Sequence, residues 1–403
     1  MKEGWLKQNI GEIAAFSQGI QVGLKHHKYN PSKGYVRFIR IVDYTQDTDD
    51  IRYVKDPGEK YYVTEDDIVM VRYGTPGLIG RGKSGVIANN LFKISINNEG
   101  ISNDYLSLYL SQSHIQKYLS TQGSSTMPAL TFGQLKKVEI NYPKSIGEQK
   151  AIVKILDEAF AKIDQAKANI EKNIENAKEL FQSKLDRTYE VFKSSSRKLG
   201  EMIELLTDYH ANGSYKVLKQ NVELKNEEDY AWMVRSTDFE KGFKNNFKYI
   251  NKHAYDYLKK SKIFGGEIII SKIGNAGKVY VMPKIDRPCS LAMNLFLLRL
   301  KKNEMSSKFL FYFLKTTKGE KQILSKLKGM ATKTITKDSV RDLNIPQVDF
   351  SIQNQIILDF EEIESKNEEL KSCYRKKLIE LEELKKSLLQ KAFAGELTKM
   401  SKP

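Results

Sequence analysis

Residues 67–74, with the sequence DIVMVRYG, return 200 residues later as EIIISKIG at residues 267–274. This is one of five matches that recur in the same order at a nearly constant offset. The other first copies begin at Ile10, Arg40, Asn90 and Leu130. Each match is weak alone, but five in register are hard to explain by chance. Two copies with so long a period are too few for a solenoid. The sequence therefore predicts a duplicated binding module.

Each half of the chain begins with a stretch that mixes short apolar segments with glycine turns, over residues 1–146 and 196–350. We expect strands where apolar, often β-branched residues lie between Gly, Asn or Pro: Ile68–Val71, Val86–Phe92, Ile268–Ile270 and Leu295–Leu300. Residues 104–119 and 307–327 are rich in Leu, Tyr and Phe at helical spacing, and each predicts one helix. Both stretches therefore read as mixed α/β domains.

Each half ends in a long helix, expected over residues 147–195 and 351–395, with a tail at 396–403. Ser145 and Glu148 fit a capping box at the first helix start. Apolar residues then recur in steps of three and four, which is typical of a coiled-coil seam. We expect the subunit-interface residues on this seam to be Ile152, Ile163, Ile170, Ile363, Leu370 and Leu381.

The length of these helices predicts how they pair. A helix of roughly 40 residues spans about 60 Å at 1.5 Å per residue, which exceeds one small domain, so each helix needs a partner. The other helix is the obvious one, and an antiparallel pair is expected. The predicted fold class is thus α/β (α+β): two mixed domains joined by two long antiparallel coiled-coil helices, with an internal pseudo-twofold repeat.

The charge of the chain is unevenly distributed. The formal net charge is +16, from 66 basic and 50 acidic residues. Residues 1–146 carry a net +4 and residues 196–350 a net +12, whereas residues 147–195 and 351–403 are neutral. Basic globular domains favour phosphate contact and hence double-stranded DNA, while neutral helices argue against a membrane surface.

Candidate DNA-binding residues lie in two glycine-rich turns and in two loops rich in small hydroxyl residues. The first copy contributes Arg72, Arg81 and Lys83 from the turn, and Ser124, Ser125 and Thr126 from the loop. The second contributes Lys262, Lys272, Lys278, Lys328, Lys333 and Thr334. Such residues suit phosphate contact. Plain structural turns and ordinary surface loops are equally compatible with the same pattern.

The sequence contains no convincing catalytic motif. Residues 77–84 fit the P-loop pattern, but the following residues read as a strand, whereas a P-loop needs a helix there. The Asn/Asp-Pro-Pro-aromatic motif of adenine methylation is missing, because no two prolines are adjacent. The five histidines show no metal-ligand spacing. We therefore predict no catalytic residue, no metal and no cofactor.

Cysteines and hydropathy point to an intracellular protein. Cys289 and Cys373 have no Cys or His cluster around them, so reduced thiols are expected. The first residues lack a signal-peptide pattern, and no stretch approaches the roughly 20 apolar residues that cross a bilayer. A cytoplasmic location is expected.

Three stretches carry a family resemblance. Pro143 is followed by EQKAIV at residues 148–153, and the second copy has Pro346 followed by NQII at 354–357, where Asn replaces Glu and Lys is missing. The tail LQKAFAGEL, residues 389–397, is the third. Together with the repeat, they make the whole chain resemble the specificity subunit of type I restriction-modification systems.

The resemblance implies a non-catalytic DNA-recognition subunit. Each domain would read one half of a split site, and the helices would set the gap. The helices would also dock two methyltransferase subunits, and restriction/translocase subunits would join that complex. Two other classes stay open: a protein-binding structural adaptor and a stand-alone nuclease. Charge confined to the domains favours DNA over the adaptor, and the lack of a convergent site disfavours the nuclease.

Overall fold

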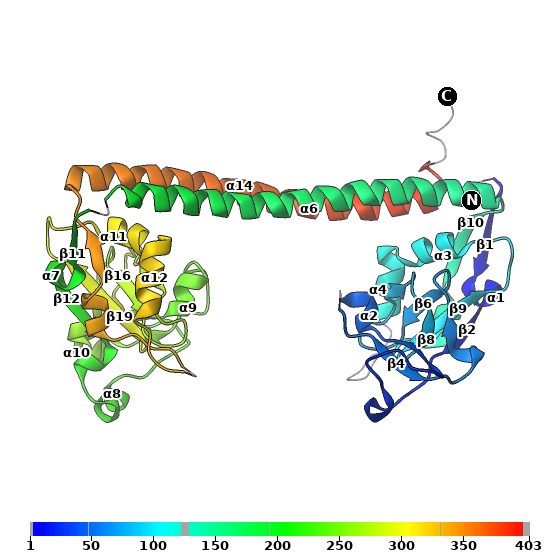
Figure 1. Ribbon diagram of the computed structural model, residues 1–403, viewed down its shortest axis with the longest axis horizontal. Coiled ribbons are helices and arrows are strands. Elements are labelled where there is room, and N and C mark those ends of the chain that lie inside the picture. The colour runs from blue at the N-terminus through cyan, green and yellow to red at the C-terminus, as the bar shows by residue number, and fades with distance from the viewer. Residues whose placement is uncertain (1–2, 47, 122–128, 193, 331, 398–403) are drawn as a thin grey trace. The chain divides into compact units, whose positions relative to one another are not determined.

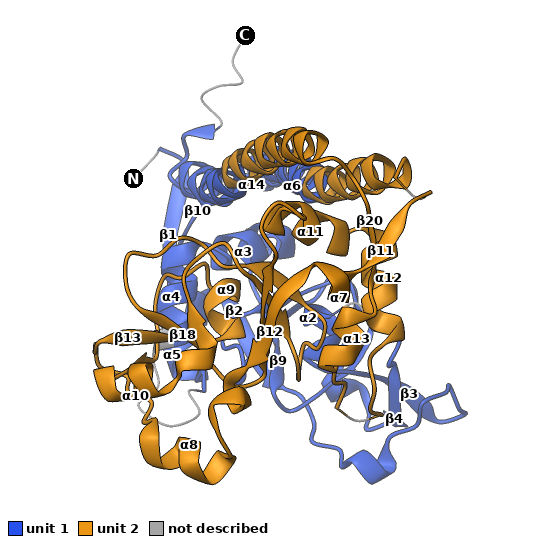
Figure 2. Ribbon diagram, turned by 90° about the vertical axis from the view of Figure 1, so that its left-hand side faces the viewer, with its two compact units in different colours: residues 1–171, 375–403 blue, residues 172–374 orange. Residues whose placement is uncertain are grey.

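The computed structural model describes residues 3–46, 48–121, 129–192, 194–330 and 332–397. The chain divides into two compact units, which Figure 2 colours separately. Unit 1 comprises residues 1–171 and 375–403, and unit 2 comprises residues 172–374. Each unit thus contains one mixed domain together with the beginning of one long helix and the end of the other.

The domain of unit 1 is built on two four-stranded sheets and a two-stranded ribbon. The first sheet is antiparallel, in the order β2 (Ala14–Gln18), β9 (Leu91–Ile96), β6 (Ile68–Val71), β7 (Ile79–Gly80). The second has the order β4 (Arg52–Lys55), β3 (Tyr35–Ile39), β8 (Gly85–Ile87), β5 (Tyr62–Val63), with β3 and β8 parallel. The ribbon pairs β1 (Trp5–Asn9) with β10 (Glu139–Pro143). The helical elements are α1 (Ile10–Ile13), η1 (Leu24–His26), α2 (Val42–Thr45), η2 (Glu59–Tyr61), α3 (Asn103–Leu110), α4 (Ser113–Thr121) and α5 (Phe132–Lys136).

The domain of unit 2 repeats this topology strand for strand. Its first sheet has the order β12 (Ile203–Asp208), β19 (Leu295–Leu300), β16 (Ile268–Ser271), β17 (Val279–Val281). Its second has the order β14 (Tyr249–Ile250), β13 (Ala231–Val234), β18 (Cys289–Leu291), β15 (Lys262–Ile263), again with one parallel pair. The ribbon pairs β11 (Ser196–Lys198) with β20 (Asn344–Pro346). The helical elements are α7 (Leu199–Met202), η3 (Tyr209–Asn212), α8 (Tyr215–Asn221), α9 (Ser236–Glu240), α10 (Lys252–Tyr257), η4 (Lys259–Ser261), α11 (Ser307–Leu314), α12 (Thr317–Ser325) and α13 (Lys337–Arg341). The internal repeat is confirmed.

Two segments differ from the sequence-based expectation. Residues 86–92 are not one strand: β8 and β9 lie in different sheets, with a turn between them. Each single helix expected over 104–119 and 307–327 is a pair. In the first pair, Gln116 donates from its side-chain amide to the carbonyl of Leu110 (2.8 Å), which satisfies the end of α3. In the second, Thr316 caps a new helix by accepting from the N–H of Gly319 (2.9 Å). Side-chain hydrogen bonds of this kind end helices that hydrophobic periodicity would continue.

The long helices are α6 (Ile146–Glu190) and α14 (Phe350–Phe393), labelled in Figure 1. They are antiparallel in both units. In unit 1 Lys167 pairs with Glu382, and Lys385 with Asp164 (3.3 Å). In unit 2 the rings of Phe181 and Phe360 are 5.8 Å apart. The predicted fold class is confirmed. Among the described residues, no helix is long and apolar enough to span a membrane.

The seam residues face inward, within the chain itself. Ile152, Ile163 and Ile170 are buried, Ile363 and Leu381 are half-buried, and only Leu370 is exposed. Ile152 belongs to the core of unit 1, and Ile363 packs against the core of unit 2. The buried seam positions therefore hold this chain together and offer no surface to a separate subunit, which corrects the expected role of Ile152, Ile163 and Ile170.

The cores of both units are completed by the ends of the long helices. Phe393, near the end of α14, packs its ring 5.1 Å from Tyr105 and 4.9 Å from Tyr109 on α3. In unit 2, Tyr189 near the end of α6 packs 5.0 Å from Phe309 and 5.6 Å from Phe313 on α11. The tail that carries the family resemblance is thus core structure of the first domain.

Candidate nucleic-acid interface

In unit 2 the glycine turn and the hydroxyl-rich loop lie together. The turn, residues 272–278, connects β16 to β17. Ile273 forms a β-bridge with Thr334, and Ile335 N–H donates to the carbonyl of Lys272 (3.2 Å). The loop is closed by reciprocal backbone bonds between Lys328 and Thr334, of 2.9 and 2.8 Å. We name this pair of segments, residues 272–278 and the described residues of 328–334, the basic face of unit 2. It brings together the predicted residues Lys272, Lys278, Lys328, Lys333 and Thr334.

Unit 1 builds the same junction. The turn after β6 begins at Arg72, whose carbonyl accepts from Leu130 N–H (2.8 Å), and Tyr73 forms a β-bridge with Ala129. Ser124, Ser125 and Thr126 lie outside the described residues. The described part places Arg72 where unit 2 has Lys272.

Glycine makes the turn possible in both copies. Gly77 and Gly277 adopt φ of 91° and 87°, a left-handed conformation that side chains disfavour. A Cβ on Gly277 would also overlap the side chain of Ile323 on α12. The N–H of each glycine closes the turn on the preceding strand, at Val71 (3.0 Å) and Ser271 (2.8 Å). The turn is therefore a preformed part of the fold.

The lysines of the basic face fall into two groups. Lys272 pairs with Asp208 (3.3 Å), and Lys278 pairs with Glu240 (3.1 Å), whose pKa is lowered chiefly by that hydrogen bond. Lys328 and Lys333 are exposed and make no side-chain ion pair or hydrogen bond with the described residues. Exposed ion pairs contribute little, typically about 0–1 kcal/mol, so Lys278 can also exchange its carboxylate for a phosphate.

Three predicted residues lie elsewhere. Lys262 is on β15 of the other sheet, 3.6 Å from a carboxylate oxygen of Asp256 and 4.0 Å from the ring centre of Tyr255. Arg81 lies at the opposite end of β6 and β7 from the turn, where it donates to the carbonyl of Asp66 (3.0 Å) and pairs with Asp104. Lys83 follows it, half-buried. The structure thus places Arg72 and Arg81 at opposite ends of one hairpin, because β7 runs antiparallel to β6, and their joint contact with DNA stays a prediction.

The P-loop reading fails structurally, as the sequence indicated. Strand β8 begins at Gly85, directly after Lys83 and Ser84, so a strand stands where a P-loop needs a helix. The described residues also contain no group of three His, Cys, Asp or Glu side chains that could hold a metal ion. Both cysteines are free thiols. Burial raises the pKa of Cys289 to about 12, which leaves that thiol protonated and unreactive at neutral pH.

Sequence reasoning missed two features. Lys337, directly after Thr336, shares Asp208 with Lys272 (both 3.3 Å) and extends the basic face. The second helix junction was also misaligned by two residues. The buried counterpart of Gln149 is Gln353, whereas Gln355 is exposed and donates to Asp359 (2.8 Å). Ile356 and Phe360 follow Gln353 by three and seven residues and share its helix face, and this apolar spacing would have indicated the correct register.

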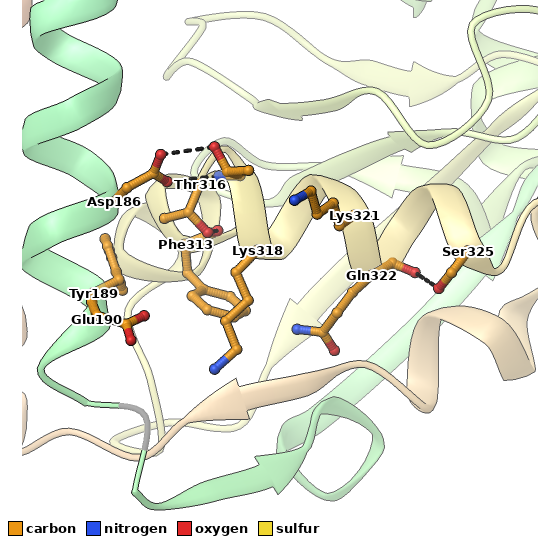
Figure 3. Close-up of a pocket in the computed structure, with 10 residues that line it drawn as sticks. Asp186, Tyr189, Glu190, Phe313, Thr316, Lys318, Lys321, Gln322 and Ser325 are labelled. Carbon is orange, nitrogen blue, oxygen red and sulfur yellow. Dashed lines mark hydrogen bonds between the residues drawn. The ribbon is translucent and has the colours of Figure 1, made fainter.

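A hollow of about 650 Å³ lies in unit 2 between the end of α6 and α12 (Figure 3). Polar residues that line it form hydrogen bonds with neighbouring parts of unit 2. The Asp186 carboxylate accepts from the N–H and the hydroxyl of Thr317 at the start of α12, both at 2.7 Å. Ser325 donates to the carbonyl of Gln322 (2.8 Å). The hollow therefore belongs to the joint between the long helix and its domain.

A duplicated α/β domain with a basic turn-and-loop face, carried on paired helices, defines a recognition protein of two repeated modules. A sequence profile described as the type I restriction modification DNA specificity domain matches residues 2–176 and 193–381. The chain belongs to this family, and it is a specificity subunit of the type I restriction-modification class, with a non-catalytic role in DNA recognition.

Two relatives and two solved structures each match 98% of this chain. The MjaVIII specificity subunit of Methanocaldococcus jannaschii is 24% identical, over 98% of this chain and 93% of its own. The EcoBI specificity subunit of Escherichia coli is 20% identical, over 98% and 87%. A chain from a structural study of type I restriction-modification complex assembly has a TM-score of 0.76, at 16% identity and coverage of 98% and 99%. The HsdS subunit of Thermoanaerobacter tengcongensis has a TM-score of 0.59, at 18% identity and 98% coverage of both chains. The two structures share the fold.

Proposed function

We propose that the domains at 1–146 and 196–350 each read one half of a split site in double-stranded DNA. The observation that carries this proposal is the backbone pairing of each turn with the segment that ends the following loop, at corresponding places in the two units: Arg72 and Tyr73 with Ala129 and Leu130, and Lys272 and Ile273 with Thr334 and Ile335. Two equal junctions on one chain suit two half-sites. Basic side chains on preformed loops suit phosphate contact, which sets the register for base reading.

We further propose that the helices, expected at 147–195 and 351–395, set the gap between half-sites and dock two methyltransferase subunits. Restriction/translocase subunits would join the same complex in the cytoplasm, and the tail at 396–403 would follow the second helix. Apolar side chains that remain exposed on α14 support a protein partner, because a seam alone does not need them: Leu358, Leu370, Ile379 and Leu384, between 38% and 64% exposed.

Salt dependence tests the DNA proposal. Affinity for duplex DNA should fall steeply with ionic strength, with a log–log slope of about −0.9 per phosphate contacted. The purified chain, with its methyltransferase partner, would be titrated on duplex at several salt concentrations. A flat response would exclude phosphate contact as the basis of binding and favour a protein-binding adaptor.

Single charge deletions should separate the basic face from the rest of the surface. Lys333→Gln should weaken binding to all sequences and reduce the slope of the salt dependence by about one contacted phosphate. Lys262→Gln is the matched control, since Lys262 lies on the other sheet against Asp256 and Tyr255. Its slope should equal that of the unaltered protein. Equal losses in both variants would contradict the assignment of the basic face.

A further inference from the structure

A buried glutamine joins the first turn of α6 to its domain. Gln149 is fully buried. Its side-chain oxygen accepts from the N–H of Ser102, the residue that caps α3 (3.0 Å). Its side-chain nitrogen donates to the carbonyls of Gly100 (2.7 Å) and Pro143 (2.8 Å). One side chain thus connects the helix to the loop before α3 and to the end of β10.

Unit 2 repeats the arrangement 204 residues later. Gln353 is 1% exposed. Its side-chain oxygen accepts from the N–H of Ser306, the capping position of α11 (2.9 Å), and its nitrogen donates to the carbonyl of Val348 (2.8 Å). Ser102 and Ser306 are themselves 204 residues apart, so both ends of the contact recur together. We name each set of bonds the glutamine latch.

The latch differs in kind from the apolar packing around it. Hydrophobic contacts are not directional, so Ile152 or Ile356 alone would allow the helix to pivot or slide on the domain. Hydrogen bonds weaken steeply when the angle departs from linear, and an amide that bonds two separate segments resists rotation about either. A buried amide that loses its partners is also costly, so partly opened positions are disfavoured.

We propose that Gln149 and Gln353 are positioning residues: they fix the direction in which each long helix leaves its domain, and so sharpen the spacing at which two half-sites are recognised. This inference rests on the proposed function, in which the helices set that gap. Neither glutamine touches DNA in this role. Each acts through the helix that it holds.

The test uses Gln149→Met and Gln353→Met, which keep the side-chain length and remove the amide. Gln355→Met is the matched control, since Gln355 lies two residues from Gln353 but is exposed. The full chain with its methyltransferase partner would first be used to map its site from modified positions in genomic DNA. Binding would then be measured on duplexes whose gap is shortened or lengthened by one and two base pairs.

The unaltered protein and Gln355→Met should prefer one gap length. In each latch variant that preference should fall by about tenfold, while affinity for isolated half-sites stays the same. Weaker binding by an equal factor at every gap would show a purely structural role and overturn the inference. An unaltered protein without a preferred gap would overturn the proposed function and this inference with it. Since the two latches lie in different units, the test can be completed even if only one of the two latch variants folds.

Hydrogen exchange gives a second reading without DNA. The N–H groups of Ser102 and Ser306 donate to the two latch oxygens, so exchange at Ser102 should accelerate in Gln149→Met and at Ser306 in Gln353→Met. Each variant should leave the other site unchanged. Exchange that is the same as in Gln355→Met at both sites would show that the latch restrains nothing.

Discussion

Replacing Phe393 with alanine should destabilise unit 1 by about 3–5 kcal/mol, the usual cost of removing a buried aromatic ring. Phe393 is 5% exposed and packs on Tyr105 and Tyr109, far away in sequence. The change leaves a cavity between α14 and α3 that neither helix can fill. Because the residue belongs to the core of unit 1, the free energy of unfolding of unit 2 should not change.

The two tryptophans make this measurable. Trp5 belongs to the same core as Phe393, and Trp232 lies in unit 2. Denaturant unfolding would be followed by fluorescence in Trp232→Phe and Trp5→Phe backgrounds, each of which reports one unit. Leu384→Ala, at a position 47% exposed on the same helix, is the control and should shift the free energy of unfolding only slightly. If Phe393→Ala moved the Trp232 transition as much as the Trp5 transition, the two units would not unfold separately.

Lengthening both long helices by four residues should lengthen the gap in the recognised DNA site. Four residues add about 6 Å and about 40° of rotation to a helix, and one or two base pairs add a similar rise and turn to a duplex. Insertions after Glu171 and Tyr374, where the two units divide, avoid both domain cores. The recognised site should keep both half-sites and gain one or two base pairs between them, as read from modified positions in genomic DNA.

Domain exchange is the control for this insertion. Replacing residues 1–146 with the corresponding domain of another family member should change one half-site and leave the gap unaltered. A recognised sequence without a gap, or a gap that ignores helix length, would show that the helices do not set the spacing.

Sequence alone predicts what depends on local pattern. Ile68–Val71 and Leu295–Leu300 match β6 and β19, because a short buried apolar run between turn residues has few other solutions. The helix pairs at α3–α4 and α11–α12 were missed because side chains such as Gln116 and Thr316 end a helix without interrupting its apolar spacing. Periodicity records burial and carries no information about which carbonyl a side-chain amide satisfies.

In the candidate site, too, the local segments could be predicted from the sequence but their tertiary contacts could not. The turn at Lys272 and the loop at Thr334 are some 60 residues apart in sequence and meet through a β-bridge. The repeat indicated only that each half of the chain contains one such turn and one such loop, and gave no sign that the two are in contact. The place of Arg81 at the other end of the hairpin could not be predicted, because two residues of strand separate it from the turn, and strand direction depends on pairing with β6. The alignment of Gln355 with Gln149 failed because Asn354-Gln355 resembles Glu148-Gln149 by residue type, whereas Gln353 is the residue that precedes Ile356 by three, as Gln149 precedes Ile152.

The partition of the chain also sets the order in which its parts can be completed during synthesis. The core of unit 1 needs Leu389, Ala392 and Phe393, which are synthesised after the whole of unit 2, whereas unit 2 uses only the continuous stretch 172–374. Domains ordinarily finish folding in the order of synthesis. Here the domain made first is completed only after the second, and a chain that stops before residue 389 leaves an apolar face of its first domain uncovered.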